Sequence, residues 1–114
     1  MVAPASGLVV LVPFPFSDLS RAKLRPAVIL AEVSRGDWIL CQITSNPYGD
    51  VQAATLTDAS FQSGSLRKTS YARPGKLFTA SHNLIVSQVG ILKGEALNNI
   101  INAVIHILRS GLKT

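Results

Sequence analysis

The sequence predicts a mainly β (α+β) fold: a small antiparallel β-barrel or strongly twisted sheet, followed by one C-terminal α-helix. Up to about residue 92, short runs of β-branched and other apolar residues alternate with turn-forming residues. After Gly94 the apolar spacing becomes helical. The chain has 114 residues, 47% of them hydrophobic, which suits one domain over residues 1–114 with a core that needs no disulfides.

The first half of the chain predicts three strands. Residues 7–12 are short, apolar and bounded by Pro13, which is typical of a buried strand. A loop over 14–24 precedes a second strand at 25–33, where Pro26 is expected at the strand start or edge because proline cannot donate to a ladder. The turn residues 34–37 lead to a third strand at 38–44. The second and third strands are therefore predicted to form a hairpin.

The second half predicts weaker strands. After a turn-rich loop at 45–50, residues 51–56 suit an edge strand, and 58–64 are expected to be a loop. Residues 65–79 predict an irregular strand with a bend or bulge at Pro74 and Gly75. A turn or short helical cap at 81–83 and a last strand at 86–92 complete the sheet.

The terminal helix has a wide apolar face. Its large aliphatic residues recur at helical spacing: Leu97, Ile100, Ile101, Val104, Ile105 and Leu108. Glu95 in the first turn and Arg109 in the last suit the helix dipole, and Gly111 is the expected stop. Such a face is expected to pack on the sheet and to meet another surface, which favours a homodimer.

Charge and cysteine content narrow the function classes. A net charge of +5 and a pI near 9.9 favour acidic partners such as nucleic acid, an acidic protein segment or an anionic surface, although mere solubility is an alternative. The single cysteine, Cys41, excludes a disulfide within the chain and is expected to be a small buried hydrophobe. The first residues lack a signal peptide and no run approaches membrane-helix length, so the expected location is the cytoplasm.

Polar residues at strand ends are the candidate site. Arg25 opens the second strand, and Thr44 and Ser45 close the third, so the predicted hairpin makes Arg25 and Thr44 near neighbours. A guanidinium and a hydroxyl that converge can hold a phosphate. The alternatives are an ordinary surface arginine and an ordinary strand-ending threonine. His82 and His106 are expected in a turn and on the polar helix face, and no metal site is expected.

Several segments together resemble the MazF/PemK (Kid) family of toxins from bacterial toxin–antitoxin pairs. They are residues 9–18 (VVLVPFPFSD), 23–30 (KLRPAVIL), 41–45 (CQITS), 64–66 (GSL), 70–79 (SYARPGKLFT) and 89–92 (VGIL). The resemblance implies an SH3-like β-barrel with a C-terminal helix, assembled as a homodimer. It also implies a sequence-specific endoribonuclease that cuts single-stranded RNA, chiefly mRNA, without metal or other cofactor. A cognate antitoxin would inhibit it by laying a flexible, often acidic segment over the RNA groove.

The resemblance also carries residue roles. Arg25 and Thr44 fall on the catalytic positions of the MazF branch. The positions expected to border or bind RNA are Ser17, Asp18, Arg21, Lys23, Ser45, Arg73 and Lys76. The Kid branch also uses an aspartate and an arginine in the later strand region. Residues 70–76 offer Arg73 but no aspartate, so the resemblance favours Arg25 and Thr44 as the catalytic pair. The RNA's own 2′-OH would attack the adjacent phosphorus, while the protein orients and stabilises charge.

The sequence also leaves alternative functions open. The same scaffold, without cutting RNA, would serve as a binding protein that acts on a protein target such as DNA gyrase or that only holds an antitoxin. The presence of both Arg25 and Thr44 favours the enzyme. A peptide-binding module for proline-rich ligands fits poorly, because only 6% of residues are aromatic. Phe16, Tyr48 and Tyr71 are possible stacking surfaces for bases, with core or rim packing as the alternative.

Overall fold

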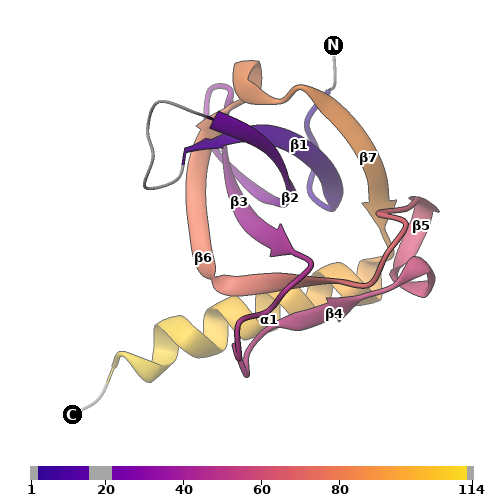
Figure 1. Cartoon of the computed structure of the whole chain (residues 1–114). Helices are drawn as coiled ribbons and strands as arrows, with labels where there is room; N and C mark the ends of the chain where they lie inside the picture. Colours follow the sequence, from indigo (N-terminus) through magenta and orange to yellow (C-terminus); the bar gives the residue numbers. More distant parts are fainter. Residues whose placement is uncertain (1–2, 16–21, 113–114) are drawn as a thin grey trace.

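The predicted architecture is confirmed (Figure 1). The computed structural model describes residues 3–15 and 22–112. Within those residues there are seven strands, two 3-10 helices and one α-helix. Their bounds are β1 Leu8–Pro15, β2 Ala22–Ser34, β3 Asp37–Thr44, β4 Ala54–Leu56, η1 Asp58–Ser60, β5 Phe61–Gly64, β6 Ser70–Ser81, η2 His82–Leu84, β7 Ser87–Leu92 and α1 Gly94–Ser110.

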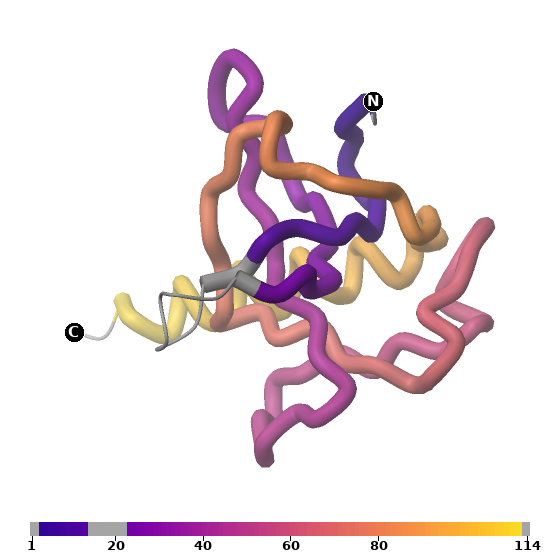
Figure 2. Tube along the Cα trace, turned by 45° about the horizontal axis from the view of Figure 1, so that its top comes forward, coloured from indigo at the N-terminus to yellow at the C-terminus, as the bar shows by residue number. Residues whose placement is uncertain are grey.

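The strands form one curled antiparallel sheet. Their order is β4-β6-β3-β2-β1-β7-β5, so β4 and β5 are its edges. The predicted β2–β3 hairpin is confirmed, and Gly36 takes the positive φ (+75°) that its tight turn requires. Figures 1 and 2 show that this turn and the loop after β3 lie at opposite ends of the curl.

Two apolar clusters bury both faces of the central strands. Alternation sends neighbouring residues to opposite clusters: Val28 and Cys41 pack toward α1, whereas Ile29 and Leu40 belong to a cluster built from the strands. Burial on both faces explains why 7–12 and 27–30 are continuous apolar runs and not alternating ones.

β2 begins earlier than predicted, and Pro26 lies within it. Pro26 pairs with Leu11 of β1, but the ladder with β3 ends at Ala27↔Gln42. At Pro26 the strand therefore pairs on one side, and the missing N–H costs no ladder bond on the other. Beyond this point β2 behaves as an edge, which is where Arg25 lies.

β6 contains the bulge predicted at Pro74 and Gly75. Its register with β3 moves from Cys41↔Leu77 to Ile43↔Ala72, so residues 73–76 face Gln42 alone. The bulge bends β6, and its first half then pairs with β4 as well as with the end of β3. Pro74 is fully buried at this bend.

The prediction of a loop at 58–64 is wrong. Residues 58–60 form η1, and β5 follows as a short edge strand on β7. Phe61 is the buried anchor of this polar segment, and its ring lies so close to Gly90 that a Cβ there would be 2.8 Å from Cδ2. The contact between Phe61 and Gly90 thus stabilises β5 although residues 61–64 have weak strand propensity. β4 is also shorter than the predicted 51–56.

The helix α1 follows its prediction, including the stop at Gly111, whose N–H donates to Leu108 O. Ile100 is fully buried, and Leu97, Ile101 and Val104 pack against the core. Further along, Ile105 and Leu108 are exposed. No helix among the described residues is long and apolar enough to cross a membrane.

We predict that Ile100→Ala lowers the free energy of unfolding by about 2–5 kcal/mol, because it leaves a cavity between α1 and the sheet. The control is Asn102→Ala, which truncates an exposed residue on the polar face of the same helix and should cost less than about 0.5 kcal/mol. Denaturant unfolding followed by circular dichroism measures both. Equal losses in the two variants would contradict this packing.

Candidate functional site

Arg25 and Thr44 lie at the same end of the β2–β3 hairpin. The register that pairs Ala27 with Gln42 reaches Arg25 and Thr44 two residues further along each strand. Alternation puts both on the face of the sheet that contains Ala27 and Leu40. Arg25 is exposed and Thr44 is half-buried, so a guanidinium and a hydroxyl face the same region of solvent-accessible surface.

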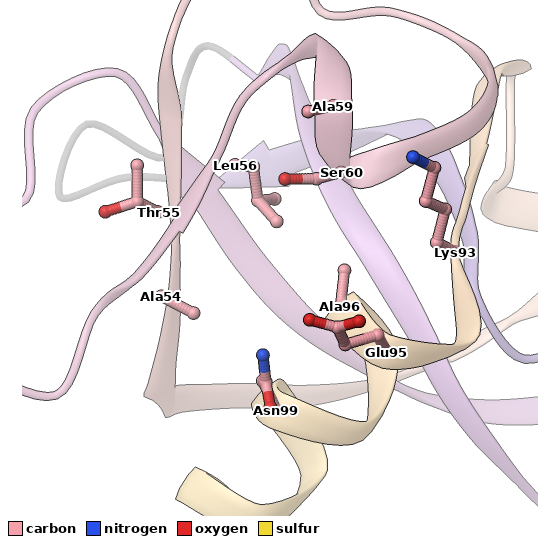
Figure 3. A pocket seen from close by; sticks show the side chains of 9 residues that line it. All are labelled: Ala54, Thr55, Leu56, Ala59, Ser60, Lys93, Glu95, Ala96 and Asn99. Atoms are coloured by element: carbon pink, nitrogen blue, oxygen red, sulfur yellow. The ribbon is translucent and has the colours of Figure 1, made fainter.

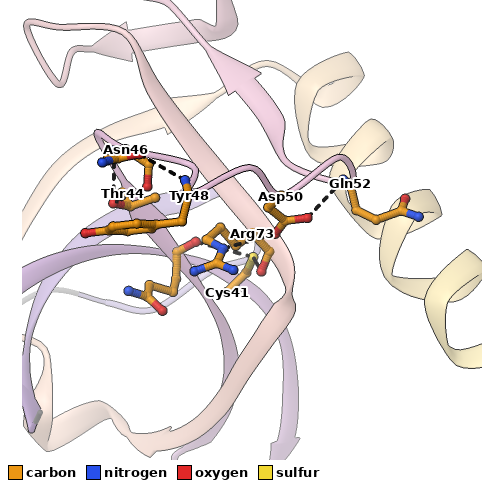
Figure 4. A network of polar contacts seen from close by, with 8 residues as sticks. Cys41, Thr44, Asn46, Tyr48, Asp50, Gln52 and Arg73 are labelled. Carbon is orange, nitrogen blue, oxygen red and sulfur yellow. Dashed lines mark hydrogen bonds and ion pairs between the residues drawn. The ribbon is translucent and has the colours of Figure 1, made fainter. Parts of the chain in front are cut away.

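The Thr44 hydroxyl anchors the loop that follows β3. Its Oγ1 donates to Asn46 O (3.1 Å) and accepts from Asn46 N (3.2 Å). Asn46 Oδ1 in turn accepts from Tyr48 N (2.9 Å), as Figure 4 shows. These local bonds fix the direction in which the chain leaves the strand. They also engage the hydroxyl hydrogen, so Thr44 must rotate its O–H to donate to a ligand.

An ion pair ties this loop to the bulge of β6. Asp50 Oδ2 accepts from Arg73 Nε at 3.0 Å, and the two side chains are only 15% and 19% exposed. Asp50 Oδ1 accepts from Gln52 N (2.9 Å). The hydrogen bond from Arg73, followed by that from Gln52, lowers the pKa of Asp50, so the carboxylate stays charged at neutral pH.

Arg73 is held from three directions. The Cys41 thiol donates to its backbone carbonyl (Sγ–O 3.1 Å), Asp50 holds its Nε, and its Cζ lies 5.7 Å from the centroid of the Tyr48 ring. Burial raises the pKa of Cys41 to about 12, which makes the thiol a structural group. As predicted, Cys41 is buried. Figure 4 shows Cys41, Arg73, Asp50 and Tyr48 grouped at the end of β3.

Sequence reasoning missed Asn46 and Asp50. Both lie in a segment whose composition indicated turns, and turn composition was their only signal. The contact between Asp50 and Arg73 spans 23 positions and depends on the bulge of β6. Asp50 also supplies a carboxylate beside Arg73, although from the loop after β3 and not from the later strand region where an aspartate was sought.

Some of the remaining predicted residues are described by the structure and others are not. Lys23, Ser45 and Lys76 are described and exposed. Lys76 lies in the bulge, and its charge contributes to lowering the pKa of Asp50. Ser17, Asp18, Arg21 and Phe16 lie outside the described residues. Tyr71 is half-buried and pairs with Thr44 across β3 and β6.

The histidines lie elsewhere. His82 begins η2, within the predicted turn or short helical cap; its N donates to Gly36 O (2.7 Å), and its ring Nδ1 is 3.3 Å from the same oxygen. His106 is exposed on α1. Among residues 3–15 and 22–112, no three His, Cys, Asp or Glu side chains are grouped so that they could hold a metal ion.

A separate hollow of about 520 Å³ lies between β4, η1 and the start of α1 (Figure 3). Its polar lining includes Lys93, Glu95 and Asn99, and Ala54 and Leu56 contribute apolar surface. None of the predicted site residues lines it. Its acidic and basic groups favour neither sign of ligand charge, so the strand ends remain the better candidate for a phosphate.

Comparison with known proteins identifies a family. Residues 5–108 match the family described as PemK-like, MazF-like toxin of type II toxin–antitoxin system. No curated protein matched the chain.

Solved structures share the fold. An endoribonuclease in complex with its cognate antitoxin from a mycobacterial species has a TM-score of 0.71 at 16% identity, covering 100% of this chain and 99% of that one. A MazE–MazF structure from Deinococcus radiodurans has a TM-score of 0.75 at 17% identity, with 95% and 98% covered. A MazF structure from the same organism has a TM-score of 0.72 at 17% identity, with 96% and 99% covered.

We predict that Asp50→Asn flattens the acid dependence of stability. The pKa of Asp50 is lowered on folding, so its contribution is present above its unfolded pKa of about 4 and is lost as pH falls through the folded pKa. Between about pH 7 and pH 3, the wild type should therefore lose more free energy of unfolding than Asp50→Asn. Urea titrations at each pH measure this. Asp37→Asn controls for the loss of one acidic charge, and equal flattening in both variants would refute the assignment.

We also predict that the native Cys41 thiol reacts slowly with a disulfide reagent. A pKa of about 12 leaves little thiolate at about pH 8, and the side chain is fully buried. Labelling should be at least about 100-fold slower in the folded protein than in guanidinium, as followed by absorbance. Comparable rates would show that the thiol is accessible.

Proposed function

Because this chain belongs to the PemK-like, MazF-like toxin family of type II toxin–antitoxin systems, we propose that it is a sequence-specific endoribonuclease that cuts single-stranded RNA, chiefly mRNA, without a metal ion. The observation that carries the proposal is the position of Arg25 and Thr44 at one end of the β2–β3 hairpin. Two groups suited to a phosphate converge there from neighbouring strands.

The reaction uses a nucleophile that RNA already contains. The 2′-OH attacks the adjacent phosphorus, so the O2′–P bond forms as the P–O5′ bond breaks. The 2′-hydroxyl loses its proton to water and O5′ takes one from water, giving a 2′,3′-cyclic phosphate and a 5′-hydroxyl. The protein must align the attacking oxygen with the leaving oxygen and stabilise charge on the phosphorane. No protein nucleophile is needed for these steps.

Arg25 and Thr44 divide this work. The Arg25 guanidinium stabilises the negative charge that develops on the phosphorane oxygens, since arginine stays protonated at neutral pH. Thr44 orients the phosphate once its hydroxyl turns from Asn46 O toward the ligand. The network behind Thr44 holds the oxygen in place during that rotation.

Neighbouring basic residues extend the site along the RNA backbone. Lys23 and Lys76 are exposed and, with Arg21 and Arg73, would contact phosphates and make binding salt-dependent. Ser17, Asp18 and Ser45 would border the RNA. A cognate antitoxin with an acidic segment would compete for the same basic surface. Two copies of the chain would act as a homodimer in the cytoplasm.

The test is cleavage of a long single-stranded RNA in excess EDTA. The wild type should make discrete cuts, whereas Arg25→Ala and Thr44→Ala should each lower the rate by roughly 10²–10³-fold, the usual cost of one charge-stabilising donor. Sequencing gels measure the cuts.

Arg35→Ala is the matched control, because Arg35 is an exposed arginine at the opposite, turn end of the same hairpin. It should cut like the wild type. Cuts by folded Arg25→Ala at the wild-type rate would refute its role. Absence of cuts by folded wild type across several unrelated RNAs would instead favour a protein that binds its target without cutting.

A further inference from the structure

We propose that Tyr48, supported by Arg73 and Asp50, is a stacking platform for one nucleobase next to the cleaved phosphate, and so determines part of the sequence specificity. This rests on the proposed function, in which the ligand is single-stranded RNA. The Tyr48 ring is the part that would touch the base. Arg73 and Asp50 are positioning residues that act through that ring.

The Tyr48 side chain is mostly exposed, so its burial contributes little to the stability of the fold. It is 70% exposed, and its φ of +54° is a left-handed backbone conformation that bulky residues rarely adopt. An exposed aromatic alone is ordinary. An exposed aromatic in an unfavourable conformation, fixed there by the bond from its N–H to Asn46 Oδ1, indicates that the surroundings over-determine its position.

One face of the Tyr48 ring is already in contact with a fixed arginine side chain, that of Arg73. The Arg73 guanidinium lies over the ring at 5.7 Å, as in a cation–π contact, and Asp50 fixes that guanidinium through Nε. The Cys41 thiol also donates a hydrogen bond to the backbone carbonyl of Arg73. One side of the ring therefore rests on a planar cation while the ring remains largely exposed, and a base on the open side would complete a three-layer stack.

The platform lies beside the proposed reaction centre. Tyr48 N is bonded to the side chain of Asn46, and Asn46 N and O are bonded to the Thr44 hydroxyl. Thr44 would orient the phosphate, so the base nearest Tyr48 belongs to a nucleotide adjoining the cut. A nucleobase fits better than a peptide side chain because it must also present its phosphate to Arg25 and Thr44.

The ion pair with Asp50 explains why Arg73 supports the Tyr48 ring more readily than it binds a phosphate. The Asp50 carboxylate neutralises Arg73 locally, and a second anion would be repelled by Asp50. Lys76, whose charge also acts on Asp50, is the better phosphate ligand of the bulge. Arg73 therefore supports Tyr48, and the phosphate contact proposed for it above uses its two terminal nitrogens, because Nε is bonded to Asp50.

Two substitutions of Tyr48 distinguish the effect of its ring from an effect on the conformation of the loop. Tyr48→Phe keeps the ring, and Tyr48→Asn removes it while retaining a residue that tolerates positive φ. Thermal melting should show both folded. Each is placed in wild type for kinetics and in Arg25→Ala, which should cut RNA at least about 100-fold more slowly, for binding.

The probe is a short RNA that spans a wild-type cut and carries 2-aminopurine at each flanking position in turn. Arg25→Ala should quench the fluorescence at one position, and adding Tyr48→Phe should preserve that quenching. Adding Tyr48→Asn should abolish it and weaken binding roughly 10-fold. Asp50→Asn should reduce the quenching, because Arg73 loses its fixed position. In the active protein, Tyr48→Asn should relax base preference at that one position.

The outcomes separate this proposal from the proposed function. If the wild type makes no cut, the proposed function fails and this proposal falls with it. If the wild type cuts but Tyr48→Asn quenches and cuts at the same sites as the wild type, only the platform is refuted. Loss of antitoxin affinity with unchanged RNA binding would likewise overturn it and assign Tyr48 to the protein partner.

Discussion

The pairing of β2 with β3 is the constraint on which the rest of the molecule depends. Both faces of these strands are buried in their central part, so a slip of one residue in the pairing would send each side chain to the opposite apolar cluster. The register is therefore fixed by burial along residues 27–30 and 40–43. Arg25 and Thr44 lie just beyond that stretch. The fixed register therefore determines the positions of their backbones, although neither side chain is fully buried.

The loop after β3 obtains its order differently. It contains few apolar anchors, and polar bonds from Thr44, Asn46 and Asp50 set its path. Its distant attachment is Arg73, which the bulge of β6 brings within reach. The two halves of the site are thus held by different forces: burial positions the strand ends, and a small electrostatic network positions the loop.

Much of this arrangement could be predicted from the sequence because it depends on local spacing. The hairpin follows from two apolar runs and a turn, and the helix from a sustained 3.6-residue period. β5 could not be predicted, since it depends on Phe61 meeting Gly90, nearly thirty positions away. Likewise, neither the Asp50–Arg73 pair nor the positive φ of Tyr48 leaves a periodic signal. Contacts of long sequence separation define the site's second half, and a single sequence contains little trace of them.

The two edge strands have a consequence for how this chain behaves at high concentration. β4 has three residues and β5 has four, so the two strands that end the sheet each offer only a brief row of backbone groups to an incoming strand. Long, flat edges recruit other chains and grow into fibres, whereas short edges end such growth before it gains enough hydrogen bonds. At these two terminal strands, an incoming chain would therefore gain only a few backbone hydrogen bonds.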